Sequence, residues 1–515
     1  MRFRLFIAAC LLSPSLLTSA QKGKIYESLP VGKYAVGYKI ITLTDESRIS
    51  KPEFNYLGEK NQGDRSEKIT IHVWYPCISG SGTRNVLFSD YCYQENLKSS
   101  TEPLDTVQKY SLISGKRRSI ENWFGKTQDA DWIDLLQTKM LAQLNADAAR
   151  KKFPLLVGML RPLSTTIVNE VLASQGYVVA MINHENINGF ADAALVEIPN
   201  LQFAIEWLQK HENVSNQLGT FGFSGSGFTQ VLFAMYDLRV QALADIESGI
   251  YMEGLYQGIS ASNFYKPSKL KIPFLHIFSH DLSRQEKYLD DFETKCKFSN
   301  RYRLILNQPK LHHWDFATEG YVSSLFLKNR GEAASNIEKS FEIATNYLLN
   351  FFDAQLKGQI EGQKFLAEKF KSEKYPSSLW EISNYAAKIP APTREEFELI
   401  VSRLGIDSAT HLTLSRLKDD SSTDVMVWFQ LNRLGYQYLD RTRYKEAIGV
   451  FKLNIILHPD DPNLYDSLCE GYERSGDNEN ARKYAAITKE MLDKKSNLTD
   501  AEKGLMGNAE KRLRN

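Results

Sequence analysis

The segment Gly222-Phe223-Ser224-Gly225-Ser226-Gly227 decides the fold of this chain. The apolar run Leu218 to Phe221 precedes it, and the apolar run Phe228 to Met235 follows it. Small residues on both sides of Ser224 let the backbone turn sharply and raise the serine hydroxyl above a sheet. The segment therefore predicts a strand, a tight turn that displays Ser224, and a helix.

Strands and helices alternate on both sides of this turn. Helices are expected up to Ser174 and around Leu201 to Leu208. Strands joined by helices of this length need crossover connections, so the pattern predicts a doubly wound α/β fold with a mostly parallel sheet. The expected strands are Lys68 to Tyr75, Phe153 to Val157, Tyr177 to Ile182, Leu218 to Phe221, Val240 to Ile246, Pro273 to Phe278 and Tyr302 to Leu306.

A serine displayed in this way becomes a nucleophile when a histidine can take its proton. His312 and His313 are adjacent and follow the last expected strand, in a chain with only nine histidines. This position favours a site over core packing. Because the helix after Ser224 points its N-terminus at the serine, the amide of Gly225 is expected to stabilise a developing oxyanion.

A carboxylate is also needed to orient the histidine, and two positions offer one. Glu247 ends the strand Val240 to Ile246, and Asp281 follows the strand Pro273 to Phe278. Asp245 is a weaker candidate, because it lies two residues earlier on its strand. The residues alone leave the choice between Glu247 and Asp281 open.

Four further segments carry a resemblance to a known family. The region from Phe153 to about Phe316 resembles the platelet-activating-factor acetylhydrolase and dienelactone hydrolase branch of the α/β-hydrolases. It does so through the order and spacing of these segments around the serine turn. They are VWYP (Val73 to Pro76), LASQGYVVAMINHE (Leu172 to Glu185), PFLHIFS (Pro273 to Ser279) and HWDFA (His313 to Ala317).

The resemblance implies roles for particular residues. The family's H-x-x-F pattern selects His313 as the base, and the acetylhydrolase spacing places the acid at Glu247, whereas dienelactone-type enzymes would place it at Asp281. The family's His-Gly, which helps form the oxyanion hole, is replaced here by Gly158 to Pro162. The second donor is then expected from the amide of Leu160 or from Arg161, through its amide or its guanidinium group.

The expected function is that of a secreted serine hydrolase that cleaves a carboxylic ester, either an acyl ester or a lactone, through an acyl-enzyme. No metal and no organic cofactor is expected, and the partner is a small-molecule ester. An insertion from about Gly80 to Ala149 is expected to fold over the mouth of the site and select the substrate. The alternative is a catalytically decayed hydrolase that serves as a scaffold for protein binding.

The N-terminus predicts export. Arg2 and Arg4 precede the apolar run Leu5 to Leu12, and the small residues Thr18-Ser19-Ala20 follow it. This pattern is typical of a signal peptide over residues 1–20, which indicates a periplasmic or extracellular protein without a transmembrane anchor. The chain has 63 Lys and Arg against 62 Asp and Glu, so no excess of positive charge favours a nucleic-acid partner.

Beyond the signal peptide the cysteines are scattered. Cys77, Cys92, Cys296 and Cys469 form no C-x-x-C pair, so they predict no zinc site. A disulfide between Cys77 and Cys92 is permitted in an exported protein, although buried free thiols are the simpler interpretation.

The C-terminal part predicts a second unit. Leu434, Tyr438 and Ala447 recur 34 residues later as Leu468, Tyr472 and Ala481, with the register of a tetratricopeptide repeat. We therefore expect a hydrolase domain at 21–360 with its insertion at 80–150, a linker and helix at 361–400, and a tetratricopeptide-like helical domain at 401–515. Such repeats can bind a protein partner or pack on the hydrolase.

Overall fold

The computed structural model forms two compact units, Met1–Ala387 and Lys388–Asn515. The expected signal peptide lies outside the described residues. The structure describes residues 24–50, 53, 59–60, 65–94, 104–160, 163–183, 190–250, 252–279, 286–307, 311–326, 332–367, 379–386, 391–419 and 426–514.

The first unit is built on one sheet with the strand order β11-β10-β9-β8-β7-β5-β6-β2-β1-β4-β3. The neighbours from β6 to β10 are parallel, and β2 is antiparallel to both β6 and β1. This arrangement confirms the expected α/β-hydrolase fold class. The strands are β1 (Ala35–Ile49), β2 (Ser66–Cys77), β3 (Asn85–Leu87), β4 (Lys139–Leu144), β5 (Phe153–Leu160), β6 (Val178–Asn183), β7 (Val214–Phe223), β8 (Ala242–Ile246), β9 (Phe274–Ser279), β10 (Asn300–Leu306) and β11 (Trp380–Ala386).

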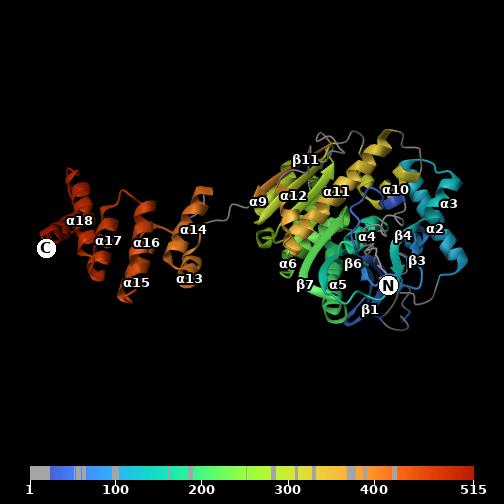
Figure 1. Ribbon diagram of the computed structural model, residues 1–515, viewed down its shortest axis with the longest axis horizontal. Helices are drawn as coiled ribbons and strands as arrows, with labels where there is room; N and C mark the ends of the chain where they lie inside the picture. The colour runs from blue at the N-terminus through green and yellow to red at the C-terminus, as the bar shows by residue number, and fades with distance from the viewer. Residues whose placement is uncertain are drawn as a thin grey trace, which may run out of the picture. The chain divides into compact units, whose positions relative to one another are not determined.

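Helices cover both faces of the sheet (Figure 1). One face buries α4 (Thr166–Ser174), α10 (Thr318–Phe326) and α11 (Glu332–Leu356). The other buries α5 (Phe190–His211), α6 (Gly225–Tyr236), α7 (Glu253–Ser260) and α9 (Glu286–Lys295). Short 3-10 turns are η3 (Lys24–Tyr26), η4 (Pro267–Lys269) and η5 (His313–Phe316). Within the described ranges, every helix is too short or too polar to cross a membrane.

The insertion differs from the expected cap, because two of its segments are strands. Strand β4 pairs in parallel with β1, and β3 pairs antiparallel with β4, so the insertion extends the sheet at one edge. Its helices are α1 (Phe88–Gln94), α2 (Thr106–Phe124) and α3 (Asp129–Gln137). Strand β3 has only three residues, which is too short to show an alternating pattern in the sequence.

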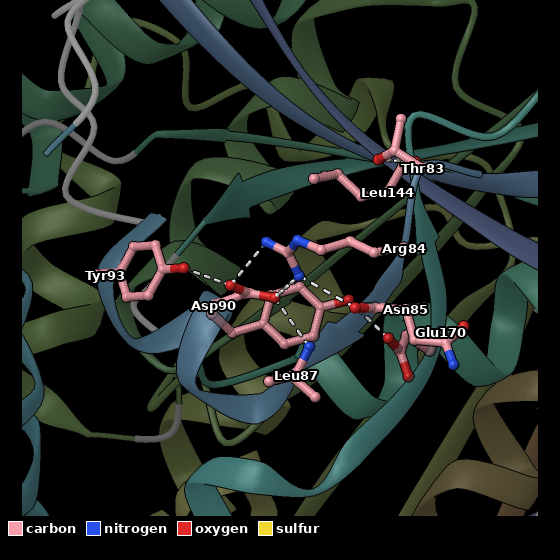
Figure 2. Close-up of polar contacts among 9 residues, drawn as sticks. Thr83, Arg84, Asn85, Leu87, Asp90, Tyr93, Leu144 and Glu170 are labelled. Atoms are coloured by element: carbon pink, nitrogen blue, oxygen red, sulfur yellow. Dashed lines mark hydrogen bonds and ion pairs between the residues drawn. The ribbon is translucent and has the colours of Figure 1, made fainter.

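Buried carboxylates fasten the insertion to the core. Glu170 of α4 accepts hydrogen bonds from the amides of Leu141 (3.1 Å) and Ala142 (3.2 Å) on β4 and from the hydroxyl of Tyr91 (2.6 Å) on α1. Burial raises the pKa of the Glu170 carboxyl. Within the insertion, Asp90 at the start of α1 is the acceptor on which Arg84, Tyr93 and the amide of Leu87 converge (Figure 2). The insertion is thus held by directional contacts as well as apolar packing.

Cys77 at the end of β2 is a buried thiol. The disulfide with Cys92 that the sequence permits is therefore not formed. Burial raises the pKa of the Cys77 thiol to about 11, so it stays protonated near neutral pH.

The expected linker and helix at 361–400 differ from the structure in one respect, because a strand of the sheet lies within this range. The range holds part of α12 (Ile360–Ala367), and β11 pairs antiparallel with β10 as the last strand of the sheet at that edge. Trp380 and Ile382 are buried in the core of the first unit, which explains why this strand belongs to the sheet. The prediction failed because the Lys- and Glu-rich sequence before β11 is typical of a solvated segment.

The second unit consists of helices, most of which pack on the next helix along the chain. All six residues of the 34-residue register are buried, between 0% and 7% exposed, as core positions would be. The tetratricopeptide assignment itself stays a prediction. The helices are α13 (Arg394–Leu404), α14 (Ile406–Asp419), α15 (Trp428–Asp440), α16 (Tyr444–Leu457), α17 (Pro462–Ser475), α18 (Asn478–Asp493) and α19 (Asp500–Arg514).

Gly435 allows α15 and α16 to approach closely, because a Cβ atom there would lie 2.3 Å from the ring of Phe451. We expect Gly435→Val to lower the free energy of unfolding of this unit by about 1–3 kcal/mol through overpacking. Hydrogen exchange of the α15 and α16 amides in the full chain measures this. Gly504→Ala on α19, where nothing lies within 4 Å of the added atom, should instead stabilise its helix. Equal effects of the two changes would contradict the packing argument.

Candidate active site

Ser224 lies in a strained turn between β7 and α6. Its backbone has φ 57° and ψ −138°, values that a residue with a side chain rarely adopts. The turn closes because neighbouring residues lack side chains: a Cβ atom on Gly222 would lie 2.7 Å from the amide nitrogen of Gly227, and one on Gly227 would lie 2.7 Å from the Cβ atom of Ser248. These close approaches require both glycines.

Ser226 occupies the last position of the G-x-S-x-G pattern, where glycine is usual. Its side chain is buried, accepts a hydrogen bond from the amide of Phe223 (3.1 Å) and donates one to the carbonyl of Phe223 (2.7 Å). Gly227 makes the close approach to the next strand. Ser226 is therefore accommodated as a brace for the end of β7.

His313 contacts the serine directly. Its Nε2 atom lies 2.8 Å from the Oγ atom of Ser224, and its side chain is 33% exposed. The imidazole stacks on the ring of Phe223, with centroids 4.9 Å apart, and meets the ring of Trp314 edge to face at 5.4 Å. The two aromatic rings limit how far the imidazole can rotate.

Glu247 supplies the carboxylate. It directly follows β8 with a φ of 54° and is 1% exposed. Its Oε2 atom lies 3.1 Å from the Nδ1 atom of His313, and its Oε1 atom accepts a 2.6 Å hydrogen bond from the amide of Ser279. Ser279 ends β9, so two neighbouring strands fix the carboxylate.

The other predicted carboxylates and the neighbouring histidine lie elsewhere. Asp281 lies outside the described residues. Asp245 is fully buried and contacts the Nδ1 atom of His276 at 2.5 Å and the hydroxyl of Ser248 at 2.6 Å. His312 is exposed, and its amide donates to Asp315. Of the two adjacent histidines, His313 is the one that meets the serine.

The predicted oxyanion donors lie at the same edge of the sheet. Gly225 is the first residue of α6, and Leu160 is the last residue of β5. Val157 of β5 pairs with Thr220 of β7, so the two strands end at the same level, beside Ser224. Arg161 lies outside the described residues.

A pocket beside this site is lined by residues that the sequence patterns do not single out. The pocket is lined by Lys116, Ser119, Ile120, Trp123, Phe124, Ser164, Trp314 and Glu319. Burial raises the pKa of Glu319 to about 7, against the opposing effect of Lys116. No periodic pattern identifies this set, because α2 and α10 are far apart in the sequence and meet only in the fold. The charged Glu319 in the apolar sequence around α10 is the one signal.

Comparisons with known proteins give a limited result. No protein-family model matches the sequence, and no curated protein matches it. Among solved structures, the ferulic acid esterase from Streptomyces cinnamoneus is similar, with 17% sequence identity and a TM-score of 0.45. The similarity covers 68% of this chain and 97% of that chain.

The strain at Ser224 gives a stability prediction. Glycine adopts a positive φ without cost, so Ser224→Gly should be more stable than Ser224→Ala by about 1 kcal/mol. Urea denaturation of both variants measures the difference. The matched control is Ser111, an exposed position inside α2, where the glycine variant should instead be less stable than the alanine variant by about 1 kcal/mol. The same order at both positions would show that the turn stores no strain.

Proposed function

We propose that this protein is a serine hydrolase that cleaves carboxylic esters through an acyl-enzyme. The observation that carries the proposal is the continuous chain of contacts from Ser224 through His313 to Glu247, which starts at a strained turn in front of a helix. A serine, a histidine and a carboxylate in this geometry form the machinery of nucleophilic acyl transfer.

In the first half of the reaction, Nε2 of His313 takes the proton of the Ser224 hydroxyl while Oγ attacks the ester carbonyl. Glu247 accepts a hydrogen bond from the Nδ1–H group of His313, which fixes the tautomer that leaves Nε2 free to act as a base. The resulting imidazolium is then paired with a carboxylate. The amide of Gly225, and that of Leu160 as the second donor, stabilise the negative charge on the carbonyl oxygen.

In the second half, His313 returns its proton to the leaving alcohol, and the acyl group stays on Ser224. Water then attacks the acyl-enzyme with His313 again as the base. The bond between Oγ and the acyl carbon breaks as His313 returns this proton to Oγ of Ser224, and the acid product leaves. Every step moves protons between groups of this chain, water and the ester, so the mechanism needs no metal and no organic cofactor.

The signal-like residues 1–20 support the further proposal that the enzyme is exported, to the periplasm or the cell exterior. There it would act on small-molecule esters. A decayed scaffold that binds protein through its helical repeats is the alternative. Ser226 in place of the usual glycine would favour such decay, but the hydrogen bonds of its hydroxyl to Phe223 give this departure from the pattern a structural use.

Ser224→Ala should abolish labelling by a fluorophosphonate probe and the hydrolysis of p-nitrophenyl acetate, because the nucleophilic oxygen is lost. Gel fluorescence and absorbance at the nitrophenolate band measure the two effects. Ser226→Ala is the matched control and should keep substantial labelling, since its hydroxyl bonds only to the Phe223 backbone. A wild-type protein that does not label would favour the scaffold alternative.

The roles of the other two residues can be separated by kinetics. His313→Ala should lower kcat by about a thousandfold or more, as expected for loss of the base, whereas the exposed His312 should matter much less. Glu247→Gln should cost far more than Asp281→Asn, because among the described residues Glu247 is the carboxylate that contacts Nδ1 of His313. A larger loss in Asp281→Asn or in His312→Ala would overturn these assignments.

A further inference from the structure

The pocket beside the candidate active site lies between the insertion and the core of the first unit. Its walls come from α2 and α10, which pack on each other and can be followed in Figure 1, and from η5. Its volume is about 200 Å³. An engineered apolar cavity of about 150 Å³ is known to hold one benzene molecule, so this pocket has room for one ring with a small substituent.

The lining of the pocket is mostly aromatic. Trp123 and Trp314 have ring centroids 5.7 Å apart and planes inclined at 46°, and Ile120 and Phe124 add further apolar surface. Trp123 is 61% exposed, whereas tryptophan side chains are on average highly buried. A bound ligand would cover this exposed ring. Tilted aromatic walls of this kind favour a flat ring, which stacks on one wall and presents its edge to the other.

One carboxyl oxygen of the pocket lining makes no hydrogen bond. Glu319 is 7% exposed, and within the described ranges its Oε2 atom makes no hydrogen bond. The Nζ atom of Lys116 lies 4.0 Å from the other oxygen, Oε1. A buried carboxyl oxygen without a hydrogen bond costs free energy that a ligand with a suitable donor would recover.

The pocket adjoins the proposed catalytic residues. Trp314 belongs to both the pocket and the candidate active site. Its ring centroid lies 5.4 Å from that of the His313 imidazole and 5.7 Å from that of the Phe223 ring. Ser164 at the pocket's edge belongs to the loop after β5, the strand that ends in the expected oxyanion donor Leu160. A group bound in the pocket therefore lies one side chain away from His313.

We propose that this pocket binds a hydroxylated aromatic ring of the ester substrate, with the ring against Trp123 and Trp314 and its hydroxyl hydrogen-bonded to the carboxyl group of Glu319. This inference rests on the proposed function, because it names the substrate class of the same site. The aromatic walls select for a ring, and the unpartnered oxygen selects for a donor on that ring. Selection by a buried hydrogen bond is stronger than selection by size alone.

The test uses phenol and toluene, which have nearly the same shape and differ in the hydrogen-bond donor. Ligand-observed NMR titrations measure their binding to the full chain that carries Ser224→Ala, so that binding is read without catalysis. Adding Glu319→Met should weaken phenol binding at least about fivefold and leave toluene binding unchanged or tighter. Burial raises the pKa of Glu319 to about 7, so the ionised carboxylate is unfavourable in the folded protein. Replacing this carboxyl by an apolar side chain should therefore not unfold the protein.

Trp123→Ala should weaken the binding of both ligands, and its large exposure makes it safe for folding. The matched control is Trp207→Ala on α5, a tryptophan that stacks on His211 away from the pocket and should change neither affinity. In the active protein, phenol should inhibit the hydrolysis of vinyl acetate competitively, with weaker inhibition in Glu319→Met.

Three results would overturn the proposal. Phenol binding that is unchanged in Glu319→Met would mean that water, and not the ligand, satisfies the carboxyl. Ligand binding that is unchanged in Trp123→Ala would mean that the ring binds elsewhere. Phenol that binds in the pocket but does not inhibit would show that the pocket is not a substrate subsite. In each case fluorophosphonate labelling of Ser224 would still stand, so failure of this inference is distinguishable from failure of the proposed function.

Discussion

The constraint on which the site depends is the positive φ at Ser224. A serine adopts it only when its surroundings hold the backbone in place. The amide of Ser224 donates to the carbonyl of Ile246 (2.9 Å), the amide of Gly227 donates to the carbonyl of Ser224 (2.8 Å), and Ser226 braces Phe223. The end of strand β8 thus holds the serine turn, and Glu247, which directly follows β8, supplies the carboxylate. Strain at the serine and the position of the acid come from one set of contacts.

The turn could be predicted from the sequence because its causes are local. Glycines at fixed offsets, an apolar strand before them and an apolar helix after them all fall within about twenty residues, the range in which patterns are informative. The carboxylate could not be chosen in the same way. Glu247 reaches His313 because its own φ is 54° and because the amide of Ser279 fixes its other oxygen. Neither condition leaves a trace in composition or periodicity.

The edges of the sheet were missed for a related reason. Strands β3, β4 and β11 are short or follow charged sequence, and they are strands because a neighbouring edge was available for pairing. The pairing of β4 then brings its amides to Glu170, and the helices of the insertion pack beside α10. The pocket walls therefore depend on tertiary pairing of strands that cannot be recognised in the sequence. Fold class follows from local patterns, whereas the environment of the site follows from the contacts made at the edges.

Among its described residues the first unit contains two histidine–carboxylate pairs, and their comparison shows what makes one of them a candidate for catalysis. His276 on β9 and Asp245 on β8 are both fully buried, and the Nδ1 atom of His276 lies 2.5 Å from a carboxylate oxygen of Asp245. His313 and Glu247 form a longer contact of 3.1 Å, with the imidazole 33% exposed. A buried pair can stabilise the fold, but no substrate can reach it. The partly exposed imidazole of His313 contacts Ser224 Oγ through its second nitrogen, Nε2, and a pocket lies beside it. What makes this pair a candidate for catalysis is therefore the access of a substrate and the contact with Ser224, and not the histidine–carboxylate contact alone.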